Sequence, residues 1–409
     1  MRTFRDFWLV YCLVADLLFF CWAGIFGMKF EGSDSSLVYK IFMTLSGSVV
    51  IGYTLLQVLR RNVHMGVSAW VLLFFLPLLF AVDYFWETSV KMIDIGKLNP
   101  FVLMMVCFSY TGICSGVCIA QRGIGHYARW LDVVMLIITV SLFISILGAL
   151  AGIVSVGGAG YQTLAYLGGF SFCINLCMIL WGDNYRRLPL FRSRLWRRLA
   201  FVLLAVQLVA CLVSGGRGGF VTLAIGSMYM LWRSRHLGKT VILSALCVLA
   251  VAAVTSVDDE SVLMRTLEKN SVRTFDYIDS DKDSFKRKTG REGVYKTALE
   301  KFVGTGYMGE GLCQGIVSGY PHNVVLEILM QGGLLYMMVW TMVFLKLFMH
   351  IHYLNANDGA WILYPLIFYH FIMLIFSGTY LTAPLFWFVI SYAYCRMDIL
   401  SAAHPDGVA

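Results

Sequence analysis

The stretch Gly66–Trp86, GVSAWVLLFFLPLLFAVDYFW, decides the fold class, because it holds a single charged residue, Asp83, in a run long enough to cross a bilayer. Crossing the hydrocarbon takes about 20 consecutive apolar residues in a helix. The run is continuous and does not alternate with polar residues, which favours a helix over a barrel strand. Similar runs predict about twelve spanning helices, at residues 8–27, 36–59, 66–86, 99–121, 130–154, 161–181, 196–214, 218–233, 239–256, 323–349, 360–378 and 380–396.

The composition of the whole chain agrees with this interpretation. Of 409 residues, 59% are hydrophobic and 14% are charged, and the mean hydropathy is +0.74. Soluble domains carry roughly 25% charged residues, and a soluble core would not bury so much apolar surface. The first run, at 8–27, is too long for the apolar core of a cleaved signal peptide, so we expect it to stay in the membrane. We therefore predict an all-α polytopic membrane protein.

Basic residues in the short connections set the predicted orientation. With a cytoplasmic N-terminus, the inner connections are rich in arginine: Arg60, Arg61, Arg122, Arg129 and six arginines within 186–198. The short outer loops hold few basic residues: Lys29, Lys91, Lys97 and Arg217. This bias predicts that both termini are cytoplasmic. The net charge of +8 is then a topology signal and a contact with anionic membrane lipids, and no nucleic-acid partner is expected.

The predicted topology divides the chain into three parts. Residues 1–256 hold the first nine spans, residues 257–322 form one large extracytoplasmic loop, and residues 323–409 hold the last three spans and a cytoplasmic tail. The loop is the exception in a chain of otherwise short connections. Long structureless loops are uncommon in compact proteins, so we looked for helical patterns within it.

Two segments of the large loop are predicted to be helical, at 261–278 and 289–302. The second begins with a capping box, Thr289 and Glu292, followed by apolar residues at helical spacing. We expect both helices to dock onto the bundle. Cys313 is the one cysteine that lies clearly in this loop, so no disulfide framework is expected there.

Two arginines near predicted helix starts are candidates for binding an anion. Arg217 stands in SGGRGG, Ser214–Gly219, at the predicted outer membrane boundary, where glycines permit a tight bend or a close approach of backbone to a ligand. Arg291 stands in the first turn of the predicted helix at 289–302, where free backbone N–H groups favour an anion. A guanidinium binds phosphate through two parallel hydrogen bonds. Taken alone, Arg217 also fits a topological anchor or a structural ion pair, and Arg291 also fits a solvated surface arginine.

Three further candidates lie where the large loop meets the tenth predicted span. His322, at the membrane surface, is placed to accept a proton from a hydroxyl group if its imidazole is neutral. Asn323 is a candidate ligand-binding residue, and it also fits the position of a helix cap. Glu327, one turn further, would orient His322 or pair with an arginine, since a carboxylate in lipid is costly when unpaired.

Other polar residues within the predicted spans fit interhelical hydrogen bonding: Asp83, Asp132, Asn175 and Gln207. Asp16 and His370 are the most informative to mutate, because ionisable groups inside membranes tend to be functional. The sequence shows no metal-ligand cluster, no Walker loop and no GxSxG motif. We therefore expect no cofactor, and we expect arginine rather than a metal ion to neutralise an anionic substrate.

Three segments together resemble the O-antigen ligase and O-antigen polymerase superfamily of bacterial membrane glycosyltransferases. They are SGGRGGF at Ser214–Phe220, TGRE at Thr289–Glu292 with the later Gly304–Gly306, and PHNVVLE at Pro321–Glu327 with Gly332–Leu334. The resemblance covers about 200–345. Gly216 stands where that family usually has a serine before the arginine, so the contribution of that hydroxyl is missing here.

The resemblance implies a GT-C-like fold and a metal-independent transfer reaction at the periplasmic side of the bacterial inner membrane. The donor would be a glycan linked to undecaprenyl diphosphate, and the acceptor another glycan or lipid A core. By resemblance, Arg217 and Arg291 would bind the diphosphate and stabilise its charge as it leaves, and His322 would activate the acceptor hydroxyl. Asn323 and Glu327 would contribute to substrate binding. A chain-length regulator is a further implied partner.

Three functions remain open from the sequence. The leading hypothesis is a polymerase that joins the repeat units of a surface polysaccharide such as O-antigen, capsule or exopolysaccharide. The second is a ligase that attaches the glycan to lipid A core. The third is a flippase or transporter of lipid-linked oligosaccharides, although a transporter is expected to show paired halves with broken helices at the midplane. The polar candidates here gather at one predicted membrane surface, which favours an enzyme.

Overall fold

The structure is a computed structural model, and it describes residues 2–16, 18–19, 22, 33–150, 159–185, 187–214, 217–234, 291–317, 321–376 and 378–403. This part of the chain is helical and contains no strand. The chain divides into two compact units. The first unit consists of Met1–Phe42, Ile124–Ser280 and Trp361–Met373. The second unit consists of Met43–Gly123, Asp281–Ala360 and Leu374–Ala409. The prediction of an all-α protein is confirmed.

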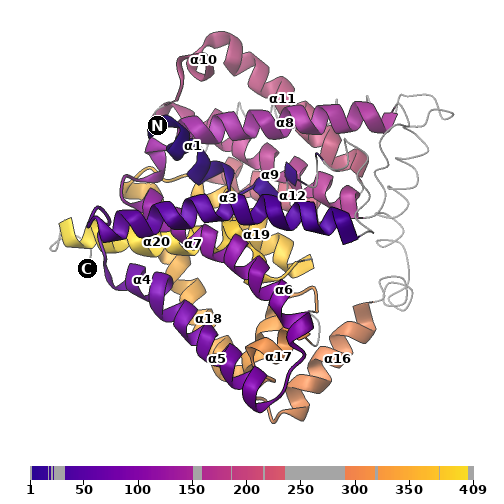
Figure 1. Cartoon of the computed structure of the whole chain (residues 1–409). Helices are drawn as coiled ribbons and strands as arrows, with labels where there is room; N and C mark the ends of the chain where they lie inside the picture. Colours follow the sequence, from indigo (N-terminus) through magenta and orange to yellow (C-terminus); the bar gives the residue numbers. More distant parts are fainter. Residues whose placement is uncertain are drawn as a thin grey trace. The chain divides into compact units, whose positions relative to one another are not determined.

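The first unit is built around α9, Ala159–Trp181, which packs against α8, α11 and α12 (Figure 1). The bounds of the other helices are Arg2–Tyr11 (α1), Ala128–Leu150 (α8), Pro189–Arg192 (α10), Arg194–Ser214 (α11) and Arg217–Ser234 (α12). Two helices cross the division between the units, α3 (Ser33–Leu59) and α19 (Leu363–Phe376).

Buried polar side chains join the helices of the first unit. Asn175 on α9 donates to Gln207 on α11 at 3.3 Å, and Gln207 donates to Thr139 on α8 at 2.8 Å. Asp132 is fully buried and forms an ion pair with Arg187 at 2.7 Å. The interpretation of Asn175 and Gln207 as interhelical hydrogen-bonding residues is therefore confirmed, and the partner of Asp132 is an arginine.

The second unit begins with two long interrupted helices. The first runs through α4 (Val67–Trp70), a π-helical stretch and α5 (Leu76–Val90). The second runs through α6 (Ile95–Met105), another π-helical stretch and α7 (Thr111–Ala120). The remaining helices of the unit are α16 (Arg291–Gly304), α17 (Leu312–Val317), α18 (Val324–Asn357) and α20 (Pro384–Ala403).

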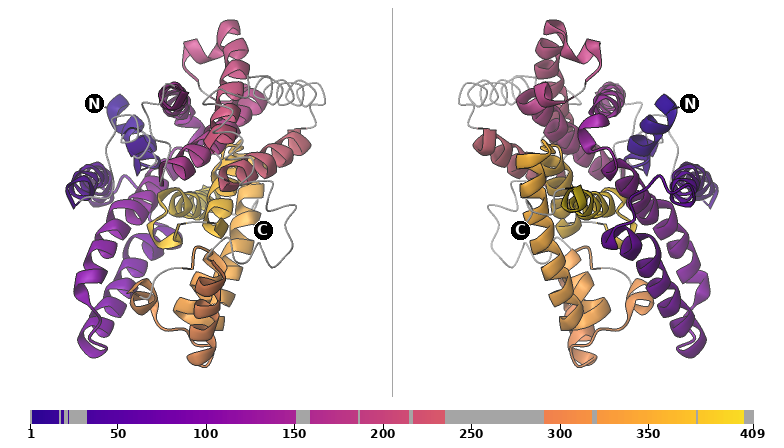
Figure 2. Two further views of the ribbon diagram at one scale, coloured as in Figure 1. Left: turned by 90° about the vertical axis from the view of Figure 1, so that its right-hand side faces the viewer. Right: turned by 90° about the vertical axis from the view of Figure 1, so that its left-hand side faces the viewer.

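The closest helix pair in the second unit is α7 with α20, which lie side by side in both sets of views (Figures 1 and 2). Glycines allow this approach. A Cβ at Gly112 would lie 2.1 Å from the backbone oxygen of Pro384, and one at Gly116 would lie 1.9 Å from the Ser391 hydroxyl. Small residues at such contacts are typical of helices that pack within membranes, where close van der Waals contact replaces the hydrophobic effect.

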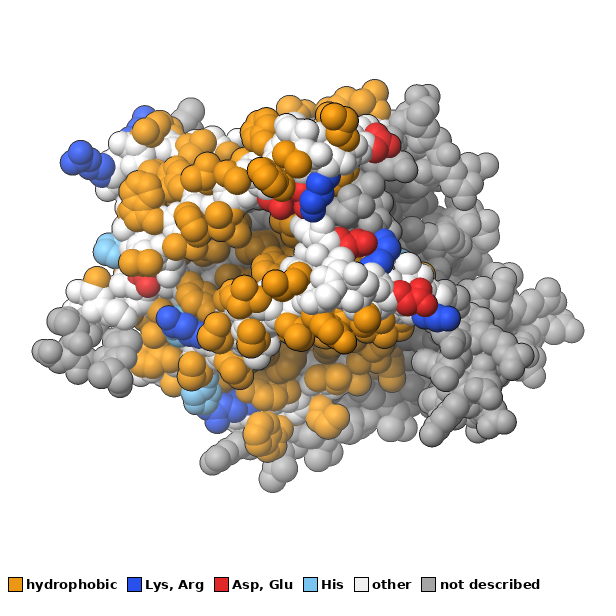
Figure 3. All heavy atoms as spheres, turned by 90° about the horizontal axis from the view of Figure 1, so that it is seen from below, with side chains coloured by type: hydrophobic (Ala, Val, Ile, Leu, Met, Phe, Trp, Pro, Cys, Tyr) orange, Lys and Arg blue, Asp and Glu red, His pale blue; other side chains and the backbone are white. Residues whose placement is uncertain are grey.

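Large apolar side chains remain exposed on the long helices of the second unit. Figure 3 shows one face of the molecule, on which most exposed side chains are hydrophobic and the charged side chains are grouped in a few places. Exposed residues include Trp70, Phe75, Leu78, Phe85 and Trp86 on α4–α5, and Leu335, Met338, Met342, Leu345 and Met349 on α18. Soluble monomers rarely expose such extended apolar surface. A lipid environment accounts for it.

Six of the described helices are long and apolar enough to cross a membrane. They lie at Leu37–Leu59, Val67–Val90, Leu98–Ala120, Ala128–Leu147, Leu164–Asn184 and Val324–Asn357. Each coincides with a predicted span, so the multi-pass membrane character is confirmed. The predicted span at 239–256 and the predicted loop helix at 261–278 lie outside the described residues. The count of twelve spans and the large loop stay predictions, while α16 matches the helix predicted at 289–302.

Candidate functional site

The turn before α18 places His322 and Asn323. His322 has a left-handed backbone with φ of 55°, which is uncommon for a residue with a side chain. Asn323 then caps the helix, because its Oδ1 accepts hydrogen bonds from the backbone N–H groups of Val325 and Leu326 at 3.0 and 3.3 Å. The cap predicted for Asn323 is confirmed, and it holds the preceding His322 at the helix start.

Glu327, one turn into α18, is only 1% exposed and is held by hydrogen bonds. Its Oε1 accepts from the hydroxyl of Thr379 and, at 3.3 Å, from the side-chain amide of Gln331. Its other oxygen, Oε2, has no hydrogen-bond partner among the described residues. A buried carboxylate is expensive unless it is hydrogen-bonded, so Thr379 and Gln331 fix the position of Glu327 and leave one oxygen for a further donor.

Two tyrosines extend this polar network. The hydroxyl of Tyr380 donates to the side-chain oxygen of Gln331, and the hydroxyls of Tyr380 and Tyr336 lie 3.1 Å apart. Tyr380 is fully buried and starts a short 3₁₀ turn that precedes α20. The network therefore ties the N-terminal part of α18, as far as Tyr336, to the 3₁₀ turn before α20 within the second unit.

The segment between α16 and α17 runs along α18 and is joined to it through the backbone. The bonds are Glu310 N–H to Met330 O at 2.8 Å, Gly311 N–H to Gln331 O at 2.9 Å, and Leu334 N–H to Tyr307 O at 3.1 Å. The residues that directly follow the motif Gly304–Gly306 thus lie against the part of α18 that contains the motif Gly332–Leu334. The sequence resemblance contained both motifs but gave no reason for this contact.

Gly333 is the residue that makes this contact possible. Its φ and ψ of 65° and −160° kink α18, a conformation that is essentially restricted to glycine. A Cβ at Gly333 would lie 2.1 Å from the carbonyl oxygen of Tyr307. The kink opens the helical hydrogen-bond ladder, so the N–H of Leu334 is free to bond to Tyr307 instead.

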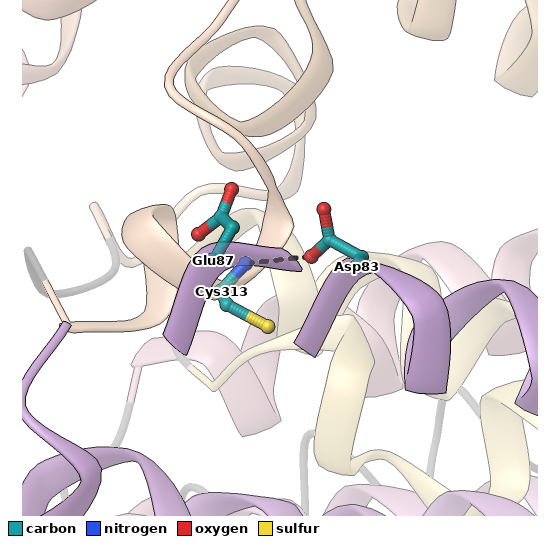
Figure 4. Close-up of side chains that lie close together, drawn as sticks. All are labelled: Asp83, Glu87 and Cys313. Carbon is teal, nitrogen blue, oxygen red and sulfur yellow. Dashed lines mark hydrogen bonds between the residues drawn. The ribbon is translucent and has the colours of Figure 1, made fainter. Parts of the chain in front are cut away.

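A second set of contacts fastens the loop segment to α5, and Figure 4 shows one of them, the hydrogen bond from the Cys313 backbone to Asp83. The backbone N–H of Cys313 donates to Asp83 at 3.2 Å, and the Lys91 ammonium donates to Glu87 and to the carbonyl of Glu310, both at 3.1 Å. We call these residues (Asp83, Glu87, Lys91, Glu310 and Cys313) the loop clamp. It holds α17 against α5, α6 and α18.

The loop clamp also contains the described residues that are best placed to hold a metal ion. Ligand atoms of Asp83, Glu87 and Cys313 lie within 4.8 Å of one another. The Lys91 ammonium already balances the charge of the Glu87 carboxylate. The three side chains therefore fit a structural contact that needs no metal ion. Burial, together with the neighbouring carboxylates of Asp83 and Glu87, raises the pKa of the Cys313 thiol.

The two candidate arginines each begin a helix. Arg291 is the first residue of α16 and Arg217 is the first residue of α12. Free N–H groups at a helix start favour bound anions, and the anion-binding role of the two arginines stays a prediction. Arg291 and His322 belong to the second unit, and Arg217 belongs to the first. The convergence of all three on one substrate stays a prediction.

The glycines that follow Arg217 serve helix packing. A Cβ at Gly218 would lie 2.1 Å from the hydroxyl of Tyr166, and one at Gly219 would lie 2.2 Å from the carbonyl oxygen of Ala165. Both contacts are with α9. These two positions therefore allow α12 to lie close to α9, which is a different use of glycine from the ligand approach that the sequence suggested.

The comparison with protein families bears directly on this region. Residues 199–341 match the family described as O-antigen ligase. This part of the chain is therefore similar to O-antigen ligases. The match includes Arg217, Arg291 and the segment His322–Glu327, and its limits agree with the resemblance at 200–345. No curated protein and no solved structure matches the chain.

Several polar residues around Glu327 and in the loop clamp were not singled out from the sequence. Thr379, Tyr380, Tyr336 and Gln331 surround Glu327, and Lys91 completes the loop clamp. Threonine and tyrosine are common in membrane helices, so their presence gives no signal. The spacing of Glu87 and Lys91, one helical turn apart at the end of an apolar run, was a usable signal of an ion pair.

Proposed function

We propose that this protein is a membrane glycosyltransferase that moves a glycan from undecaprenyl diphosphate to an acceptor sugar during surface polysaccharide assembly, and that it acts as a polymerase. The observation that carries the proposal is the O-antigen ligase match over 199–341. That region contains the candidate diphosphate-binding arginines and His322. A location in the bacterial inner membrane, with the reaction on the periplasmic side, is part of the proposal.

In the proposed reaction, the acceptor hydroxyl oxygen attacks the anomeric carbon of the donor glycan. The new glycosidic C–O bond forms as the bond from that carbon to the diphosphate oxygen breaks. The hydroxyl proton passes to His322, and undecaprenyl diphosphate leaves with the bonding electron pair. We assign to Arg217 and Arg291 the stabilisation of this growing negative charge, because preorganised donors of this kind lower the barrier.

The structure supports distinct contributions from the three residues around the start of α18. Asn323 uses its side-chain oxygen to cap the helix, which leaves its amide group for a substrate hydroxyl. Glu327 is enclosed and bonded to Thr379 and Gln331, so we propose that its unused oxygen positions a neighbouring group. His322 is the residue at the turn itself, and we assign the proton transfer to it.

The ligase reaction is the second candidate, because the matching family is described as O-antigen ligase. Both reactions use the same donor and the same transfer chemistry. They differ in the acceptor, which is the next repeat unit for a polymerase and lipid A core for a ligase.

Deletion of the gene in its native host, followed by gel analysis of surface glycans, separates the two reactions. A polymerase deletion is expected to remove the length ladder and leave a single repeat unit on the acceptor. Loss of all acceptor-linked glycan, with lipid-linked polymer still made, would instead establish the ligase. We also propose that the reaction needs no metal, so purified protein is expected to keep its activity in a chelator.

A further inference from the structure

The opposite end of the second unit from His322 contains a groove with mixed charge. It has a volume of about 420 Å³ and is lined by the late turns of α18, the late turns of α20 and the start of α4. On the predicted topology all three of these ends face the cytoplasm, since the connection that follows α3 holds Arg60 and Arg61. The groove therefore lies where the headgroups of inner-leaflet lipids are found.

One side of the groove offers a cation. The Lys346 ammonium lies 5.8 Å from the ring centre of Tyr394, within the range of a cation–π contact. The hydroxyl of Tyr394 donates to the carbonyl of Val343 at 2.8 Å, which fixes the ring. The ring of His350 packs edge-on against Tyr394 at 4.8 Å, and among the described residues its buried Nδ1 has no hydrogen-bond partner.

The other side of the groove offers an anion. Asp398 on α20 accepts a hydrogen bond from the backbone N–H of Ser68 at 2.8 Å. It thereby caps α4, whose own N-cap residue, Gly66, has no side chain to do so. Two flexible side chains, Met349 and Met397, complete the walls. A ligand in this groove meets a cation, an anion, aromatic rings and soft apolar surface.

We propose that this groove binds the headgroup of a zwitterionic phospholipid, one that carries a phosphodiester and a primary ammonium. The phosphodiester pairs with Lys346, and the ammonium pairs with Asp398 and faces the Tyr394 ring. The methionines contact the glycerol end of the lipid. An anionic headgroup without an amine would satisfy Lys346 and would be repelled by Asp398.

The proposal is tested by native mass spectrometry of the full chain, with phosphatidylethanolamine, phosphatidylcholine and phosphatidylglycerol offered in equal amounts in detergent. Phosphatidylethanolamine is expected to be retained best. The choline lipid lacks the ammonium N–H donors, and the glycerol lipid lacks the cation. Lys346→Gln is expected to weaken retention of phosphatidylethanolamine about tenfold, the size of one charge-assisted contact. Arg60→Gln, which removes an exposed cation at the same predicted membrane face, is the matched control and is expected to change nothing.

Asp398→Asn supplies the reciprocal measurement. It is expected to remove the preference for phosphatidylethanolamine over phosphatidylglycerol, while an amide oxygen can still accept from Ser68 and keep α4 capped. Thermal unfolding without added lipid checks that each variant is folded. Equal retention of all three lipids by the unmodified protein would overturn the proposal, as would an unchanged preference in both Lys346→Gln and Asp398→Asn. Stronger retention of phosphatidylglycerol would show an anion site and overturn it as well.

Discussion

At the residue scale, three residues of the short segment His322–Glu327 have different structural roles. His322 takes a left-handed backbone, Asn323 caps α18, and Glu327 is buried in a network with Thr379. These roles depend on one another. The Asn323 cap fixes the turn that contains His322, and the buried Glu327 carboxyl fixes the first turn of α18. Substitutions here therefore need controls that separate structure from chemistry.

Replacing His322, Arg291 or Arg217 by alanine is expected to lower the transfer rate by about 10²–10³-fold each, since each change removes a group that acts on the developing charge or the moving proton. The measurement is a transfer assay with the purified protein and lipid-linked donor. Arg291→Lys keeps the charge but loses the bidentate geometry, so an intermediate rate is expected. Full activity in both Arg291→Ala and His322→Ala would refute the site assignment.

Asn323→Ala is expected to destabilise the protein by about 1 kcal/mol, because the helix loses its cap. Asn323→Ser keeps a capping oxygen and loses the amide group. If Asn323 binds substrate through that amide, the serine variant retains its thermal stability but its KM for the acceptor rises. Equal activity of the serine variant and the unmodified protein would leave capping as the role of this residue.

At the scale of single elements, the kink of α18 is the feature that positions the loop. It lets the segment 304–311 lie against the helix, and the loop clamp then fixes α17 beside α5. The glycines at 218 and 219 do the same for α12 and α9. In each case glycine, which has no side chain, allows the two elements to come into contact.

Gly333→Ala is expected to destabilise the protein by at least about 1–3 kcal/mol, because alanine is strained at a φ of 65° and its Cβ would strike Tyr307. Gly52→Ala in α3 is the matched control, since nothing lies within 4 Å of a Cβ there. The control is expected to be neutral or stabilising by about 0.4–1 kcal/mol. Thermal unfolding of the two variants in the same detergent compares them. Similar stability of both would contradict the role given to the kink.

At the scale of the whole molecule, the orientation in the membrane is the main prediction still to be tested. Cys313 is a poor reporter for it, because the side chain is buried and burial near Asp83 raises the pKa of its thiol. A reagent that needs the thiolate will react slowly with the folded protein from either side. Met308, in the same loop segment, is 77% exposed and is a better position.

Met308→Cys in a Cys313→Ser background is expected to react with a membrane-impermeant maleimide added to the outer face of the inner membrane. The same reagent confined to the cytoplasmic side is expected to leave Met308→Cys unlabelled. Cys313 in the otherwise unmodified protein is expected to label only after unfolding. Labelling of Met308→Cys from the cytoplasm alone would invert the topology and, with it, the proposed periplasmic site.

From the sequence alone, the six long apolar helices and α16 could be predicted. Long apolar runs indicate where a helix lies, although α18 ends at Asn357 and not at 349 as predicted. Asn323 was recognisable as a cap because capping is a local interaction. The tertiary structure decided which helix faces meet. It joined residues 307–311 to α18, buried Cys313 beside Asp83, and bonded Glu327 to Thr379 in the turn before α20. The reason is that a membrane helix is apolar on its lipid side and its packed side alike, so hydrophobic periodicity does not mark the packed face.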